Sequence, residues 1–320
     1  MIGQTIQPLI ERENTLSSEE SSVLKILLYF DIFRHPLRLE EISSYSSFGK
    51  RGILKVQTIL NDLKSKGLLY EFEGFYMTQN NEQSVKRRLN GEKYALSSIV
   101  KAKRYSALIA RFPFVRGICL SGSISKLYMD KEADIDYFII TSPERLWIAR
   151  TFLVLFKKIF LLNSKKYFCV NYFVTEESLS IPNKNIFTAT ELAFLIPTYD
   201  YHSYNKLMLS NEWYRKYYPQ FDLRDKSHII PESKYFFKPY LERLFSGKLG
   251  EKLDCFFFKK TLNHWKNKFQ HFDPETFDLR LRSKKNESKH HPLGYQERIL
   301  HQFENNILNF EKKHAVKLDS

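Results

Sequence analysis

The sequence has few cysteines, and their placement limits what they can do. Its 320 residues include three, Cys119, Cys169 and Cys255, and no two of them have the spacing of zinc ligands. An odd number of widely separated cysteines also argues against a disulfide framework and favours a reducing, cytoplasmic setting. Cys119 and Cys169 lie in hydrophobic, strand-like segments, so we expect small buried thiols at these two positions.

Long uncharged hydrophobic runs are absent as well. The first 22 residues carry acidic residues early and no continuous apolar core, unlike a signal peptide. The most hydrophobic stretch, LWIARTFLVLFKKIFLL, is interrupted by Arg150, Lys157 and Lys158, whereas a membrane span needs ~20 nearly uncharged residues. This stretch therefore predicts a buried helix. Internal repeats and low-complexity segments are also missing, and the length suits two or three domains.

Positive charge is what the sequence has in excess. The formal net charge is +14, and residues 201–320 contain 23 Lys and Arg against 15 Asp and Glu. A basic surface favours anionic partners such as nucleotides, nucleic acids or acidic lipid headgroups. Charge alone does not choose among these partners.

Residues 1–86 predict three helices followed by a β-hairpin. ESSVLKILLYFDIF has apolar residues at helical spacing, LRLEEISSYS predicts a short second helix, and KVQTILNDLKSKGLL predicts a third that ends at Gly67. LLYEFEGFYMT alternates around Gly74, as a hairpin does. This order of elements resembles a winged helix-turn-helix domain. Such domains bind DNA, contact other proteins or have a structural role.

A DNA-binding role for this domain would depend on the third helix. Residues 1–110 contain 16 basic and 12 acidic residues, which is a small excess for a DNA-binding face. We therefore favour a role other than DNA binding. If DNA were bound, the surface residues of the third helix that would face it are Lys55, Gln57, Thr58, Asn61 and Lys64.

Residues 87–180 predict a small mixed β-sheet backed by helices. A basic amphipathic helix from Arg87 to Arg111 leads into three hydrophobic strands, FVRGICL, IDYFIIT and KYFCVNYFVT. Between the second and third strands, SPERLWIARTFLVLFKKIFLL predicts a helix with Ser142 as its N-cap. This alternation of strands and helices is typical of a mixed α/β core.

Residues 181–320 predict mostly helices. TATELAFLIPTYD predicts one that ends at Pro197, and LRLRSKKNESKHHPLG predicts a polar, basic loop between later helices. His290 and His291 lie in that loop without other ligands at suitable spacing. We interpret them as loop residues, not as metal ligands.

The segment SGSISKLYMDKEADIDYFIIT brings together the residue types that phosphoryl transfer needs. Asp134 and Asp136 stand two apart at the start of a strand, so both carboxylates point to one face and can hold a divalent cation. Gly122 and Ser123 lie where a strand ends and a helix begins, so backbone amides and the serine hydroxyl can bind a phosphate. Lys126 can add positive charge. A phosphate site facing a metal site suits phosphoryl transfer.

Gly-Ser, ten residues, then Asp-Ile-Asp before apolar residues resembles the signature of the nucleotidyltransferase superfamily, which has the DNA polymerase β-like fold. The matching positions are Gly122, Ser123, Asp134 and Asp136, within a likeness that spans roughly residues 100–180. The resemblance implies transfer of a nucleoside monophosphate from a nucleoside triphosphate to an acceptor, with release of pyrophosphate. It also implies that Asp134 and Asp136 bind two Mg²⁺ ions, with Mn²⁺ as an alternative, and that Gly122 and Ser123 bind the triphosphate.

Two positions depart from that signature. The family often has a small residue four positions after the serine, where this chain has Leu127. The family also has a third carboxylate on the third strand, where this chain has Asn171, whose carbonyl oxygen can ligate a metal but cannot take a proton. Either Asn171 serves as the third ligand, or Glu176 or Glu177 at the far end of that strand substitutes, or the site binds nucleotide without turnover.

We therefore predict an α+β protein of three parts: a winged-helix-like domain over residues 1–86, a nucleotidyltransferase-fold core over 87–180 and a helical C-terminal domain over 181–320. The favoured function is Mg²⁺-dependent nucleotidyl transfer to an unidentified acceptor, which could be a small molecule, a protein or a nucleic acid. One alternative is an inactive nucleotide-binding regulator that acts through the winged-helix domain. Another is a DNA-binding regulator in which the core is only a scaffold.

Overall fold

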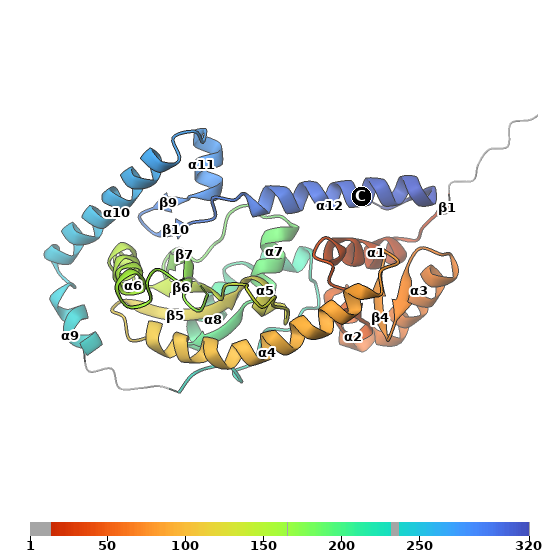
Figure 1. Ribbon diagram of the computed structural model, residues 1–320, viewed down its shortest axis with the longest axis horizontal. Coiled ribbons are helices and arrows are strands. Elements are labelled where there is room, and N and C mark those ends of the chain that lie inside the picture. Colours follow the sequence, from red (N-terminus) through yellow and green to blue (C-terminus); the bar gives the residue numbers. More distant parts are fainter. Residues whose placement is uncertain (1–13, 165, 232–236, 320) are drawn as a thin grey trace, which may run out of the picture. The chain divides into compact units, whose positions relative to one another are not determined.

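The computed structural model describes residues 14–164, 166–231 and 237–319, which form an α+β protein with mixed β-sheets (Figure 1). The chain divides into two compact units. The first runs to Val85 and also includes the chain from Ile299 onwards, whereas the second is Lys86–Arg298. The predicted boundary after residue 86 lies next to this division. Residues 181–298, predicted as part of a separate helical domain, belong to the same unit as the core strands.

The first unit contains the predicted three helices and hairpin, with a third short strand added. The sheet has the order β2-β4-β3 and is antiparallel throughout. Gly74 has φ +76° in the hairpin turn, a conformation that favours glycine. The elements are α1 (Ser18–Asp31), β2 (Leu37–Arg38), α2 (Leu39–Tyr45), η1 (Lys50–Gly52), α3 (Ile53–Ser65), β3 (Tyr70–Phe72) and β4 (Phe75–Met77).

Side-chain hydrogen bonds hold both ends of α1. The Ser17 side chain accepts from the Glu20 amide, and the Glu20 carboxylate accepts from the Ser17 amide, so two otherwise unpaired amides are satisfied. At the other end, the buried Asp31 carboxylate accepts from the amide and the hydroxyl of Thr78.

The end of the chain also belongs to the first unit. The second half of α12 (Tyr295–His314) packs on α1, with Phe303 edge-on to Tyr29. β11 (Val316–Lys317) then pairs in parallel with β1 (Asn14–Thr15).

The second unit is built on a six-stranded sheet of order β8-β5-β6-β7-β10-β9. Neighbouring strands are antiparallel except for β6 and β7, which are parallel. The three predicted core strands are β5, β6 and β7. The strands are β5 (Val115–Ser121), β6 (Asp136–Thr141), β7 (Cys169–Thr175), β8 (Ile196–Tyr199), β9 (Ser283–Lys284) and β10 (Glu287–Lys289).

Three of these strands lie where the sequence predicts helix or loop. The helix predicted to end at Pro197 ends earlier, as α7 (Ile186–Ala193), and Pro197 lies inside β8. An edge strand tolerates proline because one side of it has no ladder to complete. The prediction of a basic loop over residues 279–294 is wrong as well, because this segment contains the hairpin of β9 and β10 that extends the sheet.

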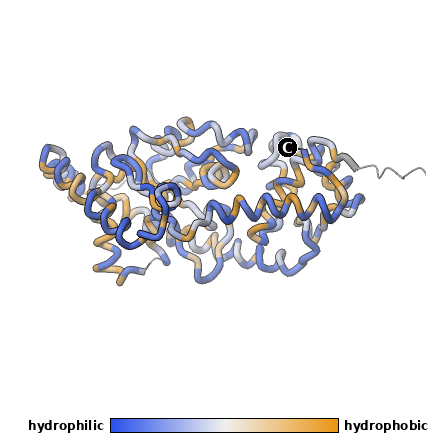
Figure 2. The backbone as a smooth tube through the Cα atoms, turned by 90° about the horizontal axis from the view of Figure 1, so that it is seen from above, coloured by the Kyte–Doolittle hydropathy of each residue, from blue (hydrophilic) through white to orange (hydrophobic). Residues whose placement is uncertain are grey.

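Helices cover both faces of this sheet. Residues of α4 (Gln83–Ile109) and α6 (Leu146–Phe160) share one hydrophobic cluster with β5, β6 and β7. α8 (Tyr201–Leu209) packs on the opposite face of β5. Hydrophobic and hydrophilic residues alternate within the turns of the helices, as expected for helices buried on one side (Figure 2). The other helices are α5 (Gly122–Ser125), η2 (Glu212–Lys216), α9 (Phe237–Leu244), α10 (Lys248–Lys268) and α11 (Pro274–Arg280).

The start of α6 differs from the prediction. Ser142 is not its N-cap, because Glu144 adopts φ +57° and delays the first helical residue to Leu146. The carboxylate of Asp254 in α10 instead accepts from the Ile148 amide at 2.9 Å. A side chain distant in sequence therefore satisfies an amide of the first helical turn. The three cysteines are free as predicted, with Cys119 and Cys169 buried and Cys255 exposed.

Candidate functional site

The motif residues meet at one end of the six-stranded sheet. Ser121, the last residue of β5, pairs with Asp136, the first residue of β6, and Asp136 pairs on its other side with Cys169. Gly122 therefore follows β5 directly beside Asp136. Gly122 has φ +67°, and a Cβ at this position would lie 2.7 Å from Asp136 Oδ2. Glycine is needed here both for its backbone conformation and for the close approach of the carboxylate.

Asp134 lies two residues before the start of β6, and Ile135 separates it from Asp136. Between the two aspartates, the Ile135 amide donates to Lys166 O and the Ile135 carbonyl accepts from the Cys169 amide. These bonds continue the pairing with the chain leading into β7, and the Ile135 side chain is fully buried. Asp134 is close enough for its charge to act on the pKa of Asp136.

Asp136 lies in an environment that disfavours its charge. Burial raises its pKa to about 6, and the charges of Glu191 and Asp134 act in the same direction. A hydrogen bond with the Cys169 thiol and the charge of Lys126 act in the opposite direction. The site therefore holds more negative charge than its own lysine balances, which is a property of sites that bind cations.

Asn171 contacts the site through the NH₂ group of its amide. Its Nδ2 donates to Asp136 Oδ1 at 3.0 Å and to Cys169 Sγ at 3.0 Å. The carbonyl oxygen is the end of this amide that could ligate a metal, and it is not the end that faces Asp136. In this geometry Asn171 orients the Asp136 carboxylate.

Glu176 and Glu177 lie at the opposite end of β7. They follow Thr175, which pairs with Thr141, and Thr141 is five residues along β6 from Asp136. Five residues of strand span roughly 17 Å. Neither glutamate can therefore replace a missing third carboxylate beside Asp136.

A glutamate that the motif did not reveal lies in the site instead. Glu191 of α7 accepts from Lys126 Nζ at 2.8 Å and from the Gly122 amide at 3.3 Å. Lys126 also donates to Gly122 O at 3.0 Å. The predicted phosphate-binding groups thus hold a carboxylate of the chain itself. The sequence carried a weak signal, because Glu191 is the single charged residue in FTATELAFLIPTY.

The remaining motif positions form the turn after β5. Ser123 is the second residue of α5, and its carbonyl accepts from the amides of Lys126 and Tyr128. Leu127, where the family often has a small residue, adopts φ +52°. The backbone at this position therefore keeps the conformation that favours glycine, although the side chain is leucine.

The histidine pair borders the same end of the sheet. The His290 amide donates to Asn171 O at 3.0 Å, so the chain after β10 remains paired with β7. Burial lowers the pKa of His291 to about 4 with help from the charge of Lys289, while the charge of Glu191 opposes the shift. Our interpretation of these histidines as residues of an ordinary loop missed this neighbourhood. Among the described residues, no group of three or more His, Cys, Asp and Glu is arranged to hold a metal.

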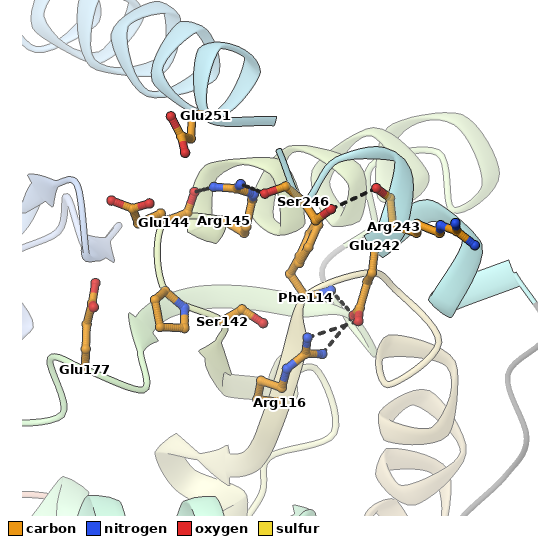
Figure 3. Close-up of a pocket in the computed structure, with 11 residues that line it drawn as sticks. Phe114, Arg116, Ser142, Glu144, Arg145, Glu177, Glu242, Arg243, Ser246 and Glu251 are labelled. Carbon is orange, nitrogen blue, oxygen red and sulfur yellow. Dashed lines mark hydrogen bonds and ion pairs between the residues drawn. The ribbon is translucent and has the colours of Figure 1, made fainter. Parts of the chain in front are cut away.

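A cavity of about 660 Å³ opens at the opposite end of the same sheet (Figure 3). Glu144, Glu177 and Glu251 lie on one side of it, and Arg116 with Glu242 lies on the other. Most of these charges have partners, since Arg116 binds both oxygens of Glu242 at 2.8 and 3.0 Å. The residues that line the cavity are Phe114, Arg116, Ser142, Pro143, Glu144, Arg145, Glu177, Glu242, Arg243, Ser246 and Glu251.

Comparisons of the chain with protein-family models, curated proteins and solved structures gave no match. Within the parts of the chain that the structure describes, no helix is long and apolar enough to cross a membrane.

Proposed function

We propose that the second unit is a nucleotidyltransferase-fold core whose Gly122–Asp136 end binds the phosphates of a nucleoside triphosphate. The proposed reaction transfers a nucleoside monophosphate to an acceptor and releases pyrophosphate. The observation that carries the proposal is the packing of the Asp136 carboxylate against Gly122, where a Cβ would come within 2.7 Å of Oδ2. This packing puts a carboxylate beside the backbone turn that follows β5, which is the pairing of groups that triphosphate chemistry needs.

The carboxylates of this end suit Mg²⁺. Protein sites usually bind Mg²⁺ through one or two carboxylates, with waters and substrate phosphates as the other ligands. Asp134 and Asp136 would hold the ion, and Mn²⁺ is an alternative with the same oxygen ligands. The fit rests on the partly buried Asp136, which has two other carboxylates near it and an amide as its direct partner. When bound, the ion would neutralise charge on the triphosphate and stabilise the transferring phosphoryl group.

The chain's own groups would position the substrate. The Gly122 amide, the Ser123 hydroxyl and Lys126 are the candidate phosphate donors. In the free protein the first and last of these bind Glu191, so an incoming phosphate would exchange with that carboxylate. Asn171 would hold Asp136 in one orientation through its Nδ2. A residue of this kind contributes by pre-organising the ligand set.

The test is an assay of pyrophosphate release with Mg²⁺, each nucleoside triphosphate and a panel of small-molecule, protein and RNA acceptors. Asp136→Asn keeps the size of the side chain and should reduce turnover by about a thousandfold or more, since a metal ligand is lost. Glu177→Gln, at the opposite end of β7, is the matched control and should leave turnover unchanged. Equal turnover in wild type and Asp136→Asn would show that the reaction does not use this site.

The second candidate function is nucleotide binding without turnover. It is favoured by Asn171, which presents NH₂ to Asp136 where the family has a third carboxylate. In such a regulator the bound nucleotide would act on the first unit, whose order of helices and strands supports a winged-helix interpretation. Calorimetry that detects Mg²⁺-nucleotide binding, together with no pyrophosphate release from any acceptor, would favour this function over transfer.

DNA binding by the first unit has less support. Three lysines on or beside α3 form ion pairs with glutamates: Lys55 with Glu19, Lys64 with Glu71 and Lys66 with Glu20. Gln57 donates to Asn61 and to the Tyr76 hydroxyl. A duplex would have to compete with these contacts for the same side chains. We therefore place DNA binding behind the two nucleotide-based functions.

A further inference from the structure

The outer face of α6 is hydrophobic along its whole length, but only its first half is covered. Ile148, Phe152, Leu155, Ile159 and Leu162 follow one another at spacings of four and three residues, which places them on one side of the helix and its terminal turn. The covered half packs in a hydrophobic cluster beneath α9 and α10. That cluster contains Phe114, Ile148 and Ala149, with Phe152, Phe245, Leu253 and Phe257 packed against it.

Beyond this cluster the same face is open. Leu155 is 45% exposed, Ile159 64%, and Leu162 90%, so exposure increases toward the end of the helix. Phe160 stacks on Phe156 yet remains 68% exposed. We call Leu155, Ile159, Phe160 and Leu162 the α6 patch. Large apolar side chains gathered in this way, rather than scattered singly, mark an interaction surface.

The turn after α6 presents the last of these side chains. Leu162 has φ +47° and Asn163 has φ +61°, in the left-handed region where a helix terminus usually has glycine. Leucine at such a position is unfavourable for the isolated backbone. Leu162 therefore exposes an apolar side chain to solvent at a position whose backbone conformation favours glycine.

Along α6 and the chain that follows it, the charged residues all have one sign. From Arg145 to Thr175 the sequence contains six Lys and Arg residues and no Asp or Glu. Lys158 is exposed and lies between Leu155 and Leu162 on the same side of the helix, three and four residues from them. Lys166 follows shortly after the turn, and its ammonium group forms a long ion pair with the exposed Glu132, at 3.6 Å.

We propose that the α6 patch docks on the surface of an anionic lipid membrane. Apolar side chains in one row with lysines beside them are the combination that inserts into the headgroup region while the ammonium groups meet lipid phosphates. The binding is peripheral, with the helix lying along the surface and its inner face still packed on the sheet.

Two other occupants fit the patch less well. A second copy of the chain related by two-fold symmetry would bring the Lys158 side chains of both copies to one interface, where like charges repel. Single-stranded nucleic acid prefers aromatic rings on which bases stack, whereas three of the four patch residues are aliphatic. Lipid accepts aliphatic and aromatic side chains alike.

The test is co-sedimentation of the full chain with vesicles of phosphatidylcholine alone and of phosphatidylcholine with about one third phosphatidylserine. We expect binding to the anionic vesicles only, weakened by added salt. Leu162→Ser and Phe160→Ser should each reduce the partition coefficient by about tenfold, because each removes a large apolar side chain that the lipid would bury. Lys158→Glu should reduce it by at least about fivefold. Leu209→Ser, which removes a 66% exposed leucine of α8, is the matched control and should bind as wild type.

Three results would overturn the proposal. The first is equal binding of wild type, Leu162→Ser and Leu209→Ser to anionic vesicles. The second is self-association, measured by light scattering, that Leu162→Ser abolishes while vesicles bind nothing. The third is retention of single-stranded RNA that depends on Phe160 while vesicles bind nothing. None of these measurements depends on nucleotidyl transfer, so the outcome is independent of the function proposed above.

Discussion

The two ends of the six-stranded sheet use charged residues in different ways. At the cavity end, Arg116 pairs with Glu242 through two hydrogen bonds, and the guanidinium of Arg145 donates to the carbonyls of Glu144, Phe245 and Ser246. At the motif end, the charges of Glu191 and Asp134 disfavour the ionised form of Asp136, and the charge of Lys126, which pairs with Glu191, favours it.

This difference distinguishes charged side chains that are already paired within the fold from carboxylates that lack enough positive charge nearby. A partly buried pair with bidentate geometry satisfies the hydrogen-bonding groups of both side chains and leaves them little capacity for a ligand. Carboxylates gathered with too little positive charge cost stability, and folds keep such arrangements where a cation or substrate completes them. This criterion supports our proposal that the motif end, and not the cavity end, binds the ligand.

The largest difference between the two ends is expected when a glycine at each end is replaced by alanine. Gly122→Ala places a Cβ 2.7 Å from Asp136 Oδ2 at φ +67°, whereas Gly247→Ala, beside the cavity, meets nothing within 4 Å. Strain and overpacking together should lower the free energy of unfolding by about 2–4 kcal/mol for Gly122→Ala. Nucleotide affinity should fall by about a hundredfold, since the turn that we propose binds phosphate must move.

Chemical denaturation and calorimetry of both glycine variants measure these effects. Gly247→Ala should match wild type in each. If Gly122→Ala were as stable as Gly247→Ala, the close packing of the turn on Asp136 would not exist in solution.

Two buried groups, Asp254 at the cavity end and His291 at the motif end, should contribute to the pH dependence of stability with opposite sign, whereas Asp136 contributes in the same direction as Asp254. Burial raises the pKa of Asp254 near the cavity from 3.8 to about 6, so between these values the folded chain holds a proton that the unfolded chain has lost. Its contribution to the free energy of unfolding therefore falls as pH rises through this window. Burial lowers the pKa of His291 at the motif end from 6.5 to about 4, so its contribution rises with pH from about 4 to 6.5.

Each of these two contributions is on the order of 3 kcal/mol, at about 1.4 kcal/mol per pKa unit. Urea denaturation between about pH 4 and pH 7 checks the signs. Asp254→Asn should make stability rise more steeply with pH, and His291→Gln should make it rise less steeply. Slopes that change in the same direction in both variants would contradict the assignment.

A third carboxylate at the motif end should raise its affinity for a divalent cation. Asn171→Asp adds a negative charge beside Asp136, at the position where Nδ2 now donates to Oδ1. Without metal the variant should be less stable than wild type, because two carboxylates then face each other. Its affinity for Mg²⁺ or Mn²⁺ should rise about tenfold, as measured by calorimetry. Glu176→Gln, at the far end of β7, is the control and should change neither quantity.

The sequence allowed the local part of this architecture to be predicted. β5, β6 and β7 are continuous hydrophobic runs, and Gly122, Ser123, Asp134 and Asp136 lie close to them along the chain. The first-unit helices follow from apolar spacing and a capping box in the same way. These features depend on neighbours within a few residues, which is the range over which a pattern in one sequence is informative.

The positions of Glu191 and of the histidine pair could not be predicted, because they depend on the pairing of strands that are distant in the sequence. Glu191 reaches Gly122 because β8, which follows α7, pairs with β5, and β8 contains a proline that suggested a helix end instead. His290 reaches Asn171 because β10, three residues long and polar, pairs with β7. Neither strand has the alternation that identifies a strand in sequence. The orientation of the Asn171 amide depends on both Asp136 and Cys169, which only the folded sheet brings together.

The smallest effects are expected where charges at the cavity end are already matched. Glu242→Gln should lower the free energy of unfolding by about 1 kcal/mol, because Arg116 loses a bidentate, half-buried partner while the Phe114 amide keeps an acceptor. Glu177→Gln, on the exposed side of the cavity, should change stability by less than can be measured. Urea denaturation at low and high salt compares the two, and salt should reduce the Glu242→Gln effect only slightly, since partly buried pairs are poorly screened. If neither substitution alters nucleotide binding, the cavity end supports the fold alone. A loss of nucleotide binding in Glu242→Gln with stability unchanged would instead move the functional site to the cavity.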